Sequence, residues 1–247
     1  MLRRAGCVFA EEEARLLLGA ARDGAHLAGL VRQRVTGRPL EQILGWAEFC
    51  GLRVAVAPGV FVPRRRTEFL VEQATGLLPR AGASVLDLCC GSGAVGAALL
   101  STSTVVLHAS DIDPVAVACA RRNLPATPVH CGDLYDPLPA ELRGRVDVVV
   151  VNAPYVPSDA IATMPAEARL HEPRTALDGG PDGVDVHRRV AAAAPGWLAP
   201  GGHLLVETSR RQARWTADAC TRAGLVARVV HSPRLDAIVV VAEAPIR

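Results

Sequence analysis

The chain has 247 residues, of which half are hydrophobic, so it can bury the core of one large domain with a small appendage. Its 27 basic residues are all arginine, and the formal net charge of +2 is too small to indicate a nucleic-acid partner held by bulk electrostatics. No apolar run approaches the ~20 residues of a membrane span, and the seven cysteines include no C-x-x-C pair. We therefore expect a cytoplasmic protein with no membrane partner and no metal site.

The first part of the chain has a helical pattern followed by an extended one. Residues 10–36 carry an apolar face at helical spacing and predict one or two helices. Short extended runs between residues 43 and 56 could pair as a hairpin. Residues 67–78 are again helical in spacing, with Thr67 as the predicted N-cap. We expect residues 1–78 to form a helical and hairpin region on the substrate side.

From residue 79 onward the pattern alternates between strand and helix. Ala-rich helical stretches separate most of the β-prone runs, which cover residues 84–88, 105–110, 129–131, 146–151 and 203–207. Such alternation predicts an α/β, Rossmann-like fold with a mostly parallel sheet covered by helices on both faces. Two final runs, 226–231 and 237–242, are joined by too short a turn for a parallel crossover, so they must be antiparallel.

The segment from Asp87 to Gly96 is the first candidate site. It follows a strand and opens a helix, which is where an α/β sheet binds ligands. Gly91 and Gly93 let the backbone approach a ligand, and together with Gly96 they match the dinucleotide fingerprint. Asp111 ends the next strand, at the spacing of an acid that binds ribose hydroxyls. One interpretation is therefore an NAD-dependent oxidoreductase, and another is a tight turn without a ligand.

Three features favour S-adenosyl-L-methionine as the cofactor. Asp87 can meet the cationic amino group of this methyl donor, directly or through water, whereas it would repel a pyrophosphate. The antiparallel pair at the end of the sheet is not required by a plain dinucleotide fold. The third feature is the acceptor tetrapeptide, Asn152-Ala153-Pro154-Tyr155, which follows the strand at 146–151 and so lies at the carboxyl edge of the sheet beside the glycines.

The acceptor tetrapeptide suits methylation of an amide nitrogen, which is a poor nucleophile. An enzyme must hold the NH₂ group in line with the methyl group and accept its hydrogens. The side-chain oxygen of Asn152 and the carbonyl of Ala153 can do so, and Pro154 restricts Ala153 to extended backbone. Tyr155 can stack on a planar amide and exclude water. The alternative without function is a strand that ends in a proline turn capped by asparagine.

These residues resemble a known family. The tetrapeptide resembles the Asn-Pro-Pro-Tyr signature of amino-methyltransferases, and its surroundings resemble the HemK/PrmC branch, the protein-(glutamine-N5) methyltransferases. Further matches to this branch lie at residues 38–45, 58–64, 172–183 and 200–202. The resemblance implies the class I methyltransferase fold over residues 79–247, with S-adenosyl-L-methionine as the cofactor.

The resemblance also implies a role for each site residue. Asp111 would hold the ribose, although Asp113 competes for this role and also resembles a helix N-cap followed by proline. Asp133 and Leu134 would border the adenine. The methionine part would be held by the loop residues Asp87, Cys89, Gly91 and Gly93. The acceptor amide would be held by Asn152, Ala153, Pro154 and Tyr155, with Asn152 also bordering the methyl donor.

Four departures from the family pattern carry expectations of their own. Ala153 replaces the first proline of the signature, which loosens that position. Cys89 stands where a loop glycine is usual, so we expect no positive φ there. Residues 64–66 are three arginines, which we interpret as a solvated patch, with an anionic partner as the alternative. Only about 35 residues precede Gly37, where the family places a longer helical bundle, so we expect the chemistry to survive with less surface to grip a protein substrate.

The function predicted from these observations is methylation of the side-chain amide (N5) of a protein glutamine, in the Gly-Gly-Gln motif of peptide chain release factors. A ribosomal protein glutamine and adenine N6 of a nucleic acid remain alternative acceptors. The adenine alternative requires a target-recognition region and a basic groove, so we expect no nucleic acid as a direct substrate. The more distant alternatives are the NAD-dependent oxidoreductase and a binding module without catalysis.

Overall fold

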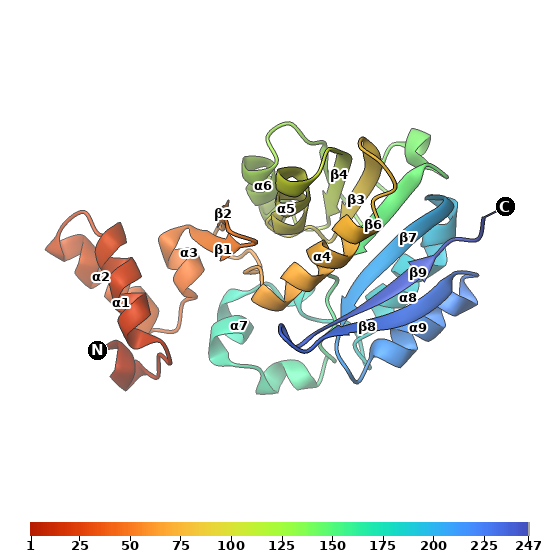
Figure 1. Cartoon of the computed structure of the whole chain (residues 1–247). Helices are drawn as coiled ribbons and strands as arrows, with labels where there is room; N and C mark the ends of the chain where they lie inside the picture. Colours follow the sequence, from red (N-terminus) through yellow and green to blue (C-terminus); the bar gives the residue numbers. More distant parts are fainter. Residues whose placement is uncertain (247) are drawn as a thin grey trace.

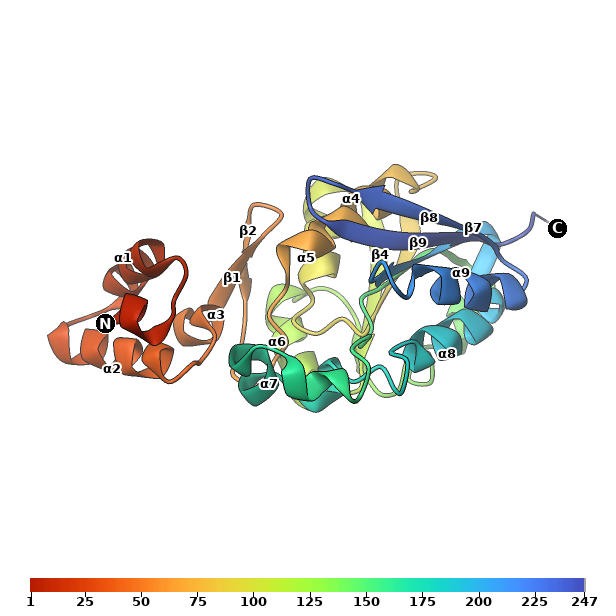
Figure 2. The ribbon, with the colours of Figure 1, turned by 90° about the horizontal axis from the view of Figure 1, so that it is seen from below.

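The N-terminal part of the chain is helical. The computed structural model describes residues 1–246, and these begin with a 3₁₀ turn and three helices: η1 Leu2–Ala5, α1 Ala10–Ala20, α2 Gly24–Val35 and α3 Leu40–Leu44. A small core of their own is formed by Leu2, Ala10, Leu17 and Leu30. Asp23 caps α2 by accepting a hydrogen bond from the backbone N–H of His26 at 2.7 Å. The helices predicted within residues 10–36 are confirmed, and they lie beside the sheet rather than over it (Figure 1, Figure 2).

A hairpin follows, as the sequence predicts. Strand β1 (Trp46–Phe49) pairs antiparallel with β2 (Leu52–Ala55). Phe49 and Val54 point from it into the main core. Asn123, the last residue of α6 (Pro114–Asn123), accepts a hydrogen bond from the N–H of Ala55 at 2.8 Å and donates one to its carbonyl at 2.9 Å. These contacts hold the hairpin against the larger unit.

Helix α4 (Glu68–Gly76) lies where the sequence predicts it, but its predicted cap is wrong. The 3₁₀ turn η2 (Arg65–Thr67) runs directly into α4, so Thr67 already has helical dihedrals, with φ −66° and ψ −15°. An N-cap side chain reaches the first turn from extended backbone, and the side chain of Thr67 caps no N–H. Thr67 is only 2% exposed, and its hydroxyl contacts the side-chain amide of Asn152 instead of a backbone N–H of the helix.

The main sheet has seven strands in the order β5-β4-β3-β6-β7-β9-β8. Their bounds are β3 Ala83–Leu88, β4 Val105–Asp111, β5 Val129–Cys131, β6 Val146–Val151, β7 Leu198–Thr208, β8 Val226–Ser232 and β9 Ala237–Glu243. Five neighbouring strands, β5, β4, β3, β6 and β7, are parallel to one another. Strand β9 is antiparallel to both of its neighbours, β7 and β8. The predicted mostly parallel α/β sheet with an antiparallel C-terminal strand is confirmed. Strand β9 lies inside the sheet, between β7 and β8, which the sequence pattern did not predict.

Helices cover both faces of this sheet. One face packs against α4, α5 (Ala94–Thr102) and α6, and the other against α8 (Asp185–Ala193) and α9 (Ala213–Arg222) (Figure 1). In β6, Val148 and Val150 belong to the first core, while Val149 and Val151 belong to the second. A strand buried on both faces is apolar throughout, which explains its run of valines.

Helix α7 (Ala166–His171) lies between the N-terminal helices and the sheet (Figure 1). Glu167 of α7 pairs with Arg34 of α2 at 3.1 Å, and Arg34 also pairs with Glu13 of α1 at 2.6 Å. These ion pairs connect the N-terminal helices to the chain that follows β6. None of the helices within residues 1–246 has the length and apolarity that a membrane crossing requires.

The strand order decides where the site lies. The chain runs outward from β3 through β4 to β5, and then returns to the other side of β3 to form β6. At such a reversal the loops beyond the strands diverge and leave a crevice. The last residues of the two central strands, Leu88 of β3 and Val151 of β6, are paired in register. The glycine-rich loop, which is the segment from Asp87 to Gly96, and the acceptor tetrapeptide therefore lie side by side.

Candidate active site

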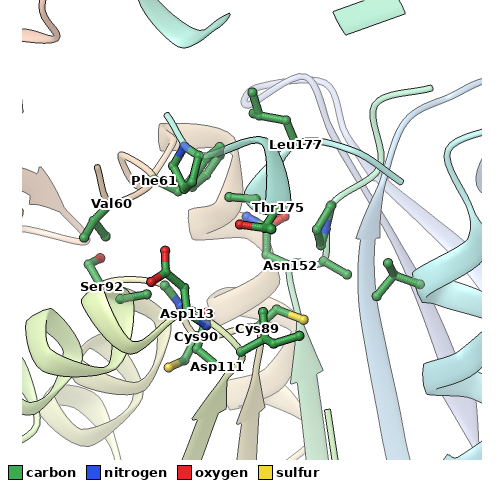
Figure 3. Close-up of a pocket in the computed structure, with 18 of the residues that line it drawn as sticks. Val60, Phe61, Cys89, Cys90, Ser92, Asp111, Asp113, Asn152, Thr175 and Leu177 are labelled. Carbon is green, nitrogen blue, oxygen red and sulfur yellow. Dashed lines mark hydrogen bonds between the residues drawn. The ribbon is translucent and has the colours of Figure 1, made fainter. Parts of the chain in front are cut away.

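A pocket of about 550 Å³ opens at this crevice. Its walls come from the glycine-rich loop, the ends of β4 and β5, the acceptor tetrapeptide, the strap (residues 58–64) and the Glu-Pro loop (residues 172–183) (Figure 3). Apart from Gly93, every site residue predicted from the sequence lines it: Asp87, Cys89, Gly91, Asp111, Asp133, Leu134, Asn152, Ala153, Pro154 and Tyr155. The positions predicted for the methyl donor and for the acceptor thus share one cavity.

Gly93 has a packing role instead. It precedes α5 with φ +76°, in the left-handed region. A Cβ atom at this position would lie 2.9 Å from Cδ1 of Leu124 and 3.2 Å from Cβ of Ala120. A glycine therefore lets α5 approach the end of α6, and Gly93 is not among the residues that line the pocket.

The loop turns at Cys89, and here the expectation from the sequence is wrong. Cys89 has φ +55°, the same value as Gly91, so a side chain occupies the left-handed region after all. This conformation costs about 1–2 kcal/mol for a residue with a Cβ. A hydrogen bond from the N–H of Cys90 to the carbonyl of Ser110, at 3.1 Å, ties the loop to β4. Cys90 lies in one core of the sheet and Cys89 packs against the other, both as small apolar side chains.

Asp87 lines the pocket and is 2% exposed. Its Oδ2 accepts a hydrogen bond from the N–H of Gly96 at 3.0 Å, and among residues 1–246 no hydrogen-bond donor reaches Oδ1. Burial raises the pKa of Asp87 to about 7, helped by the charge of Asp111 and opposed by the Gly96 N–H. A buried carboxylate with one open oxygen fits a cationic amino group, which would stabilise its ionised form.

Asp111 holds the loop from the next strand. Its Oδ2 accepts a hydrogen bond from the N–H of Gly91 at 2.8 Å, and its Oδ1 accepts one from the N–H of Asp113 at 2.9 Å. Burial raises the pKa of Asp111, and these N–H groups oppose the rise. A carboxylate has about four acceptor sites, so two remain for hydroxyl groups in the pocket. Asp113 caps α6 through Val115 N–H at 2.8 Å, which confirms the N-cap interpretation.

Asp133 and Leu134 line the pocket where β5 ends. Oδ2 of Asp133 accepts a hydrogen bond from Nη2 of Arg189, on α8, at 2.5 Å. Leu134 has φ +47°, and its carbonyl accepts a hydrogen bond from the hydroxyl of Ser110 at 2.8 Å. The sequence analysis did not identify Arg189, because no local pattern links a residue on α8 to one after β5.

The acceptor tetrapeptide is held by two side chains that the sequence analysis did not assign to the site. Nδ2 of Asn152 donates a hydrogen bond to Oγ1 of Thr67 at 3.3 Å, which leaves Oδ1 as the free acceptor of that amide. Nε2 of Gln212 donates to the carbonyl of Tyr155 at 2.7 Å and to that of Asp182 at 3.0 Å. Gln212 is buried at the start of α9, and a lone glutamine there carries no signal of this role.

Glycines of the Glu-Pro loop allow it to pack on the tetrapeptide backbone. A Cβ atom at Gly179 would lie 2.8 Å from the carbonyl oxygen of Pro154, and one at Gly183 would lie 2.4 Å from that of Tyr155. Val156 also bonds the loop through its N–H, which donates to the carbonyl of Leu177 at 2.9 Å. The loop that matches the family closely is thus the support of the acceptor residues.

The arginine run is partly the solvated patch expected from the sequence, since Arg65 and Arg66 are exposed and Arg64 is half-buried, but two of the three also bind carboxylates. Nη2 of Arg64 lies 2.6 Å from Oε1 of Glu172, whose side chain is fully buried. Nε of Arg66 lies 3.4 Å from Oε1 of the buried Glu207, and its guanidinium lies 5.9 Å from the centre of the Tyr155 ring. Within this run, Arg65 is the one arginine that has no ion pair with another residue of 1–246, and it is exposed. The anionic partners of Arg64 and Arg66 are carboxylates of this chain.

The donor set fits S-adenosyl-L-methionine. A buried carboxylate for an ammonium group, a second one for ribose hydroxyls and an apolar wall for a base lie along one cavity, in Asp87, Asp111 and Leu134. When bound, this cofactor supplies a methyl group on a sulfonium, which is an activated leaving group. The chain itself contributes binding, orientation and the exclusion of water.

Comparisons with known proteins agree with this geometry. The family described as Methyltransferase small domain matches residues 51–183. A release factor glutamine methyltransferase of Geobacter sulfurreducens is 40% identical over 204 residues, which cover 79% of this chain and 69% of that protein. A protein of the same name from Bradyrhizobium diazoefficiens is 36% identical, with 95% of this chain and 87% of that protein covered.

Solved structures agree on the fold. A methyltransferase from Pyrococcus furiosus has a TM-score of 0.61 at 15% identity, over 79% of this chain and 90% of that one. The ribosomal protein L11 methylase of Lactobacillus delbrueckii subsp. bulgaricus has a TM-score of 0.56 at 13% identity, over 77% and 84%. At such identities the likeness concerns the fold alone, and the family rests on the curated relatives. The chain belongs to the release factor glutamine methyltransferases, and it is an S-adenosyl-L-methionine-dependent methyltransferase of the class I fold.

Proposed function

We propose that this enzyme transfers a methyl group from S-adenosyl-L-methionine to the side-chain amide nitrogen (N5) of a glutamine, in the Gly-Gly-Gln motif of a peptide chain release factor. The observation that carries this proposal is the orientation of Asn152. Its amide nitrogen is engaged by Thr67, so its oxygen Oδ1 is the atom left to accept a hydrogen from the acceptor NH₂. The names of the curated relatives support the same substrate.

In this proposal each wall of the pocket holds one part of the methyl donor. Asp87 binds the amino group and Asp111 binds the ribose hydroxyls, while Leu134 borders the adenine. Asp133 acts through its ion pair with Arg189, which supports the same wall. Asp87 is buried and Asp111 is half-buried, which favours strong interactions, since a low local dielectric strengthens charge-assisted hydrogen bonds.

The acceptor glutamine would enter on the other side, over the tetrapeptide. Oδ1 of Asn152 and the carbonyl of Ala153 accept the two hydrogens of its amide, which draws electron density toward the nitrogen. The transfer releases one of these hydrogens as a proton, and the neutral N-methyl amide remains. Tyr155 covers the amide plane. No strong base is required of the chain, because the nitrogen gains its nucleophilic character from orientation.

The walls of the pocket suit a side chain with glycine neighbours. Val60 and Phe61 from the strap and Thr175 and Leu177 from the Glu-Pro loop line it (Figure 3). Glycines beside the acceptor remove side chains that would clash with these walls, so that the amide reaches a recessed methyl group. We further propose that residues 1–78 form the side on which the protein substrate docks. Release factors act on ribosomes, so this substrate implies work in the cytoplasm.

The test is mass spectrometry of release factors incubated with the enzyme and S-adenosyl-L-methionine. We expect one added methyl group on the peptide that contains Gly-Gly-Gln. A release factor with this glutamine changed to asparagine is the matched control and should stay unmodified. If the Gly-Gly-Gln peptide stays unmodified while a ribosomal protein or a nucleic acid from a cell extract gains the methyl group, the chemistry holds and the proposed substrate is wrong.

A further inference from the structure

Glu207 is a buried carboxylate below the acceptor tetrapeptide. It lies near the end of β7 and is 2% exposed, and neither of its oxygens has a hydrogen bond of ordinary geometry within residues 1–246. Nε of Arg66, at 3.4 Å, is its ion-pair partner. Burial raises the pKa of Glu207, whereas Thr67, Arg66 and the hydroxyl of Tyr155 lie close enough to lower it. A charge buried so deeply is costly unless its neighbours are arranged around it.

Thr67 connects this carboxylate to the acceptor residue. Its Oγ1 accepts the hydrogen bond from Nδ2 of Asn152 at 3.3 Å. A hydroxyl has a single hydrogen, so the hydrogen of Thr67 is free to point at Glu207. An ionised carboxylate only accepts hydrogen bonds. Arg66, which precedes Thr67 in the chain, lies 3.4 Å from Glu207, so these residues are grouped, and the hydrogen bond observed in this group (the relay) runs from Asn152 to Thr67.

We propose that Glu207 and Thr67 are positioning residues that fix which way the amide of Asn152 points. This inference rests on the proposed transfer to an amide nitrogen. With Asn152 donating to Thr67, as the structure shows, Oδ1 of Asn152 is left to face the acceptor and accept a hydrogen from its NH₂. If the amide turned over, it would present its own NH₂ to another NH₂, and two hydrogen-bond donors repel each other.

Tyr155 is the second polar side chain of the acceptor tetrapeptide. Burial raises the pKa of Tyr155 to about 12, and the charge of Glu207 adds to the rise. The ring is held between Arg66, at 5.9 Å, and His187, whose ring centre lies 6.4 Å away. Arg66 thus contacts both the buried carboxylate and the ring of Tyr155.

A positioning role differs from a purely structural one in what it changes. Loss of a structural residue lowers stability, and it weakens binding of the methyl donor along with activity. Loss of the relay leaves the pocket in place and lets the amide of Asn152 turn, so that the rate of methyl transfer falls while binding persists. An interaction made mainly in the transition state affects kcat rather than KM.

The experiment compares Thr67→Val, which has the same shape without the hydroxyl, with Thr67→Ser, which keeps the hydroxyl. We expect Thr67→Val to lower kcat by about 30-fold while KM and the Kd of S-adenosyl-L-methionine change by less than about three-fold. Thr67→Ser should recover most of the lost rate. Glu207→Gln should lower kcat by about 10-fold, because its amide can also donate to Thr67 and reverse the relay. Thr102→Val, which removes a hydroxyl that bonds only its own helix, is the control.

The side-chain ¹⁵N–¹H signals of Asn152, assigned through their absence in Asn152→Ala, give a second readout that does not depend on activity. We expect these signals to move in Thr67→Val and to return in Thr67→Ser. Equal kcat in Thr67→Val and the parent, loss of methyl-donor binding in Thr67→Val, or unmoved Asn152 signals would each overturn the proposal. If the parent enzyme methylates no glutamine, the proposed function fails, while the NMR signals still test the relay.

Discussion

Arg64 and Glu172 form an ion pair beside the pocket, with Nη2 of the arginine 2.6 Å from Oε1 and 2.7 Å from Oε2 of the glutamate. The N–H of Val62 donates to the same carboxylate at 3.1 Å. The strap, which comes before the sheet, is thereby fastened to the Glu-Pro loop, which comes after the acceptor tetrapeptide. Both walls of the acceptor entrance depend on this one buried carboxylate.

Arg64→Ala should therefore lower the free energy of unfolding by about 2 kcal/mol, because Glu172 is left buried without its cation. The value is smaller than for a fully buried pair, since the Arg64 side chain is 33% exposed. Urea unfolding checks this. Arg65→Ala is the matched control. The side chain of Arg65 is exposed, so its removal should change the free energy of unfolding by less than about 0.5 kcal/mol. Similar losses in the two variants would contradict a special role for Arg64.

Asp111→Ala should weaken binding of S-adenosyl-L-methionine by about 1.5–3 kcal/mol, which is the scale of hydrogen bonds to a charged group. Asp113→Ala should cost about 1 kcal/mol of stability through the lost cap of α6, with binding of the methyl donor nearly kept. Titration calorimetry and thermal unfolding separate the two effects. Equal affinity in Asp111→Ala and the parent would remove Asp111 from the ribose site.

Asn152→Ala should abolish methyl transfer while the affinity for the methyl donor stays within about three-fold of the parent, since this side chain acts on the acceptor in the transition state. Single-turnover assays with a saturating methyl donor measure the rate. Ala153→Pro should keep the activity, because it restores the rigid turn of the family signature. A normal rate in Asn152→Ala would move the acceptor site elsewhere.

Binding of the methyl donor should weaken as the pH falls through about 7, the pKa to which burial raises Asp87. The ammonium of the methyl donor prefers the ionised carboxylate, so binding below this pH must release a proton. Calorimetry in buffers with different ionisation heats measures that proton, and Asp87→Asn should lack it. A proton count that does not change between pH 6 and pH 8 would contradict the assignment.

The carboxyl group of Asp87 also affects the free energy of unfolding when no ligand is bound. Its pKa in the fold is about 7, above the ordinary value of 3.8, so the neutral carboxyl stabilises the fold. This contribution is complete below the unfolded pKa and is lost as the pH rises through the folded one. Asp87→Asn should accordingly raise Tm at pH 8 and have a smaller effect at pH 5.

Much of this protein follows from local pattern. The valine run of residues 146–151 and the helical stretches around it predict a buried parallel strand, because each side chain along such a strand meets a helix layer. The glycine-rich loop and the acceptor tetrapeptide follow strands, and the carboxyl ends of parallel strands share one edge. The pocket and most of its predicted residues could therefore be derived before the structure was known.

Only the tertiary structure decided the contacts between side chains that lie far apart in the sequence. Cys89 adopts φ +55° because the turn between β3 and α5 is imposed by both elements, which overrides the preference of the residue. Thr67 and the three arginines resemble a cap and a solvated patch when their neighbours in sequence are the only context. Asn152 contacts the Thr67 hydroxyl from far along the chain, and Glu172 and Glu207 bind two of the arginines, since a carboxylate that the fold buries must find its partners among the groups that the fold brings to it.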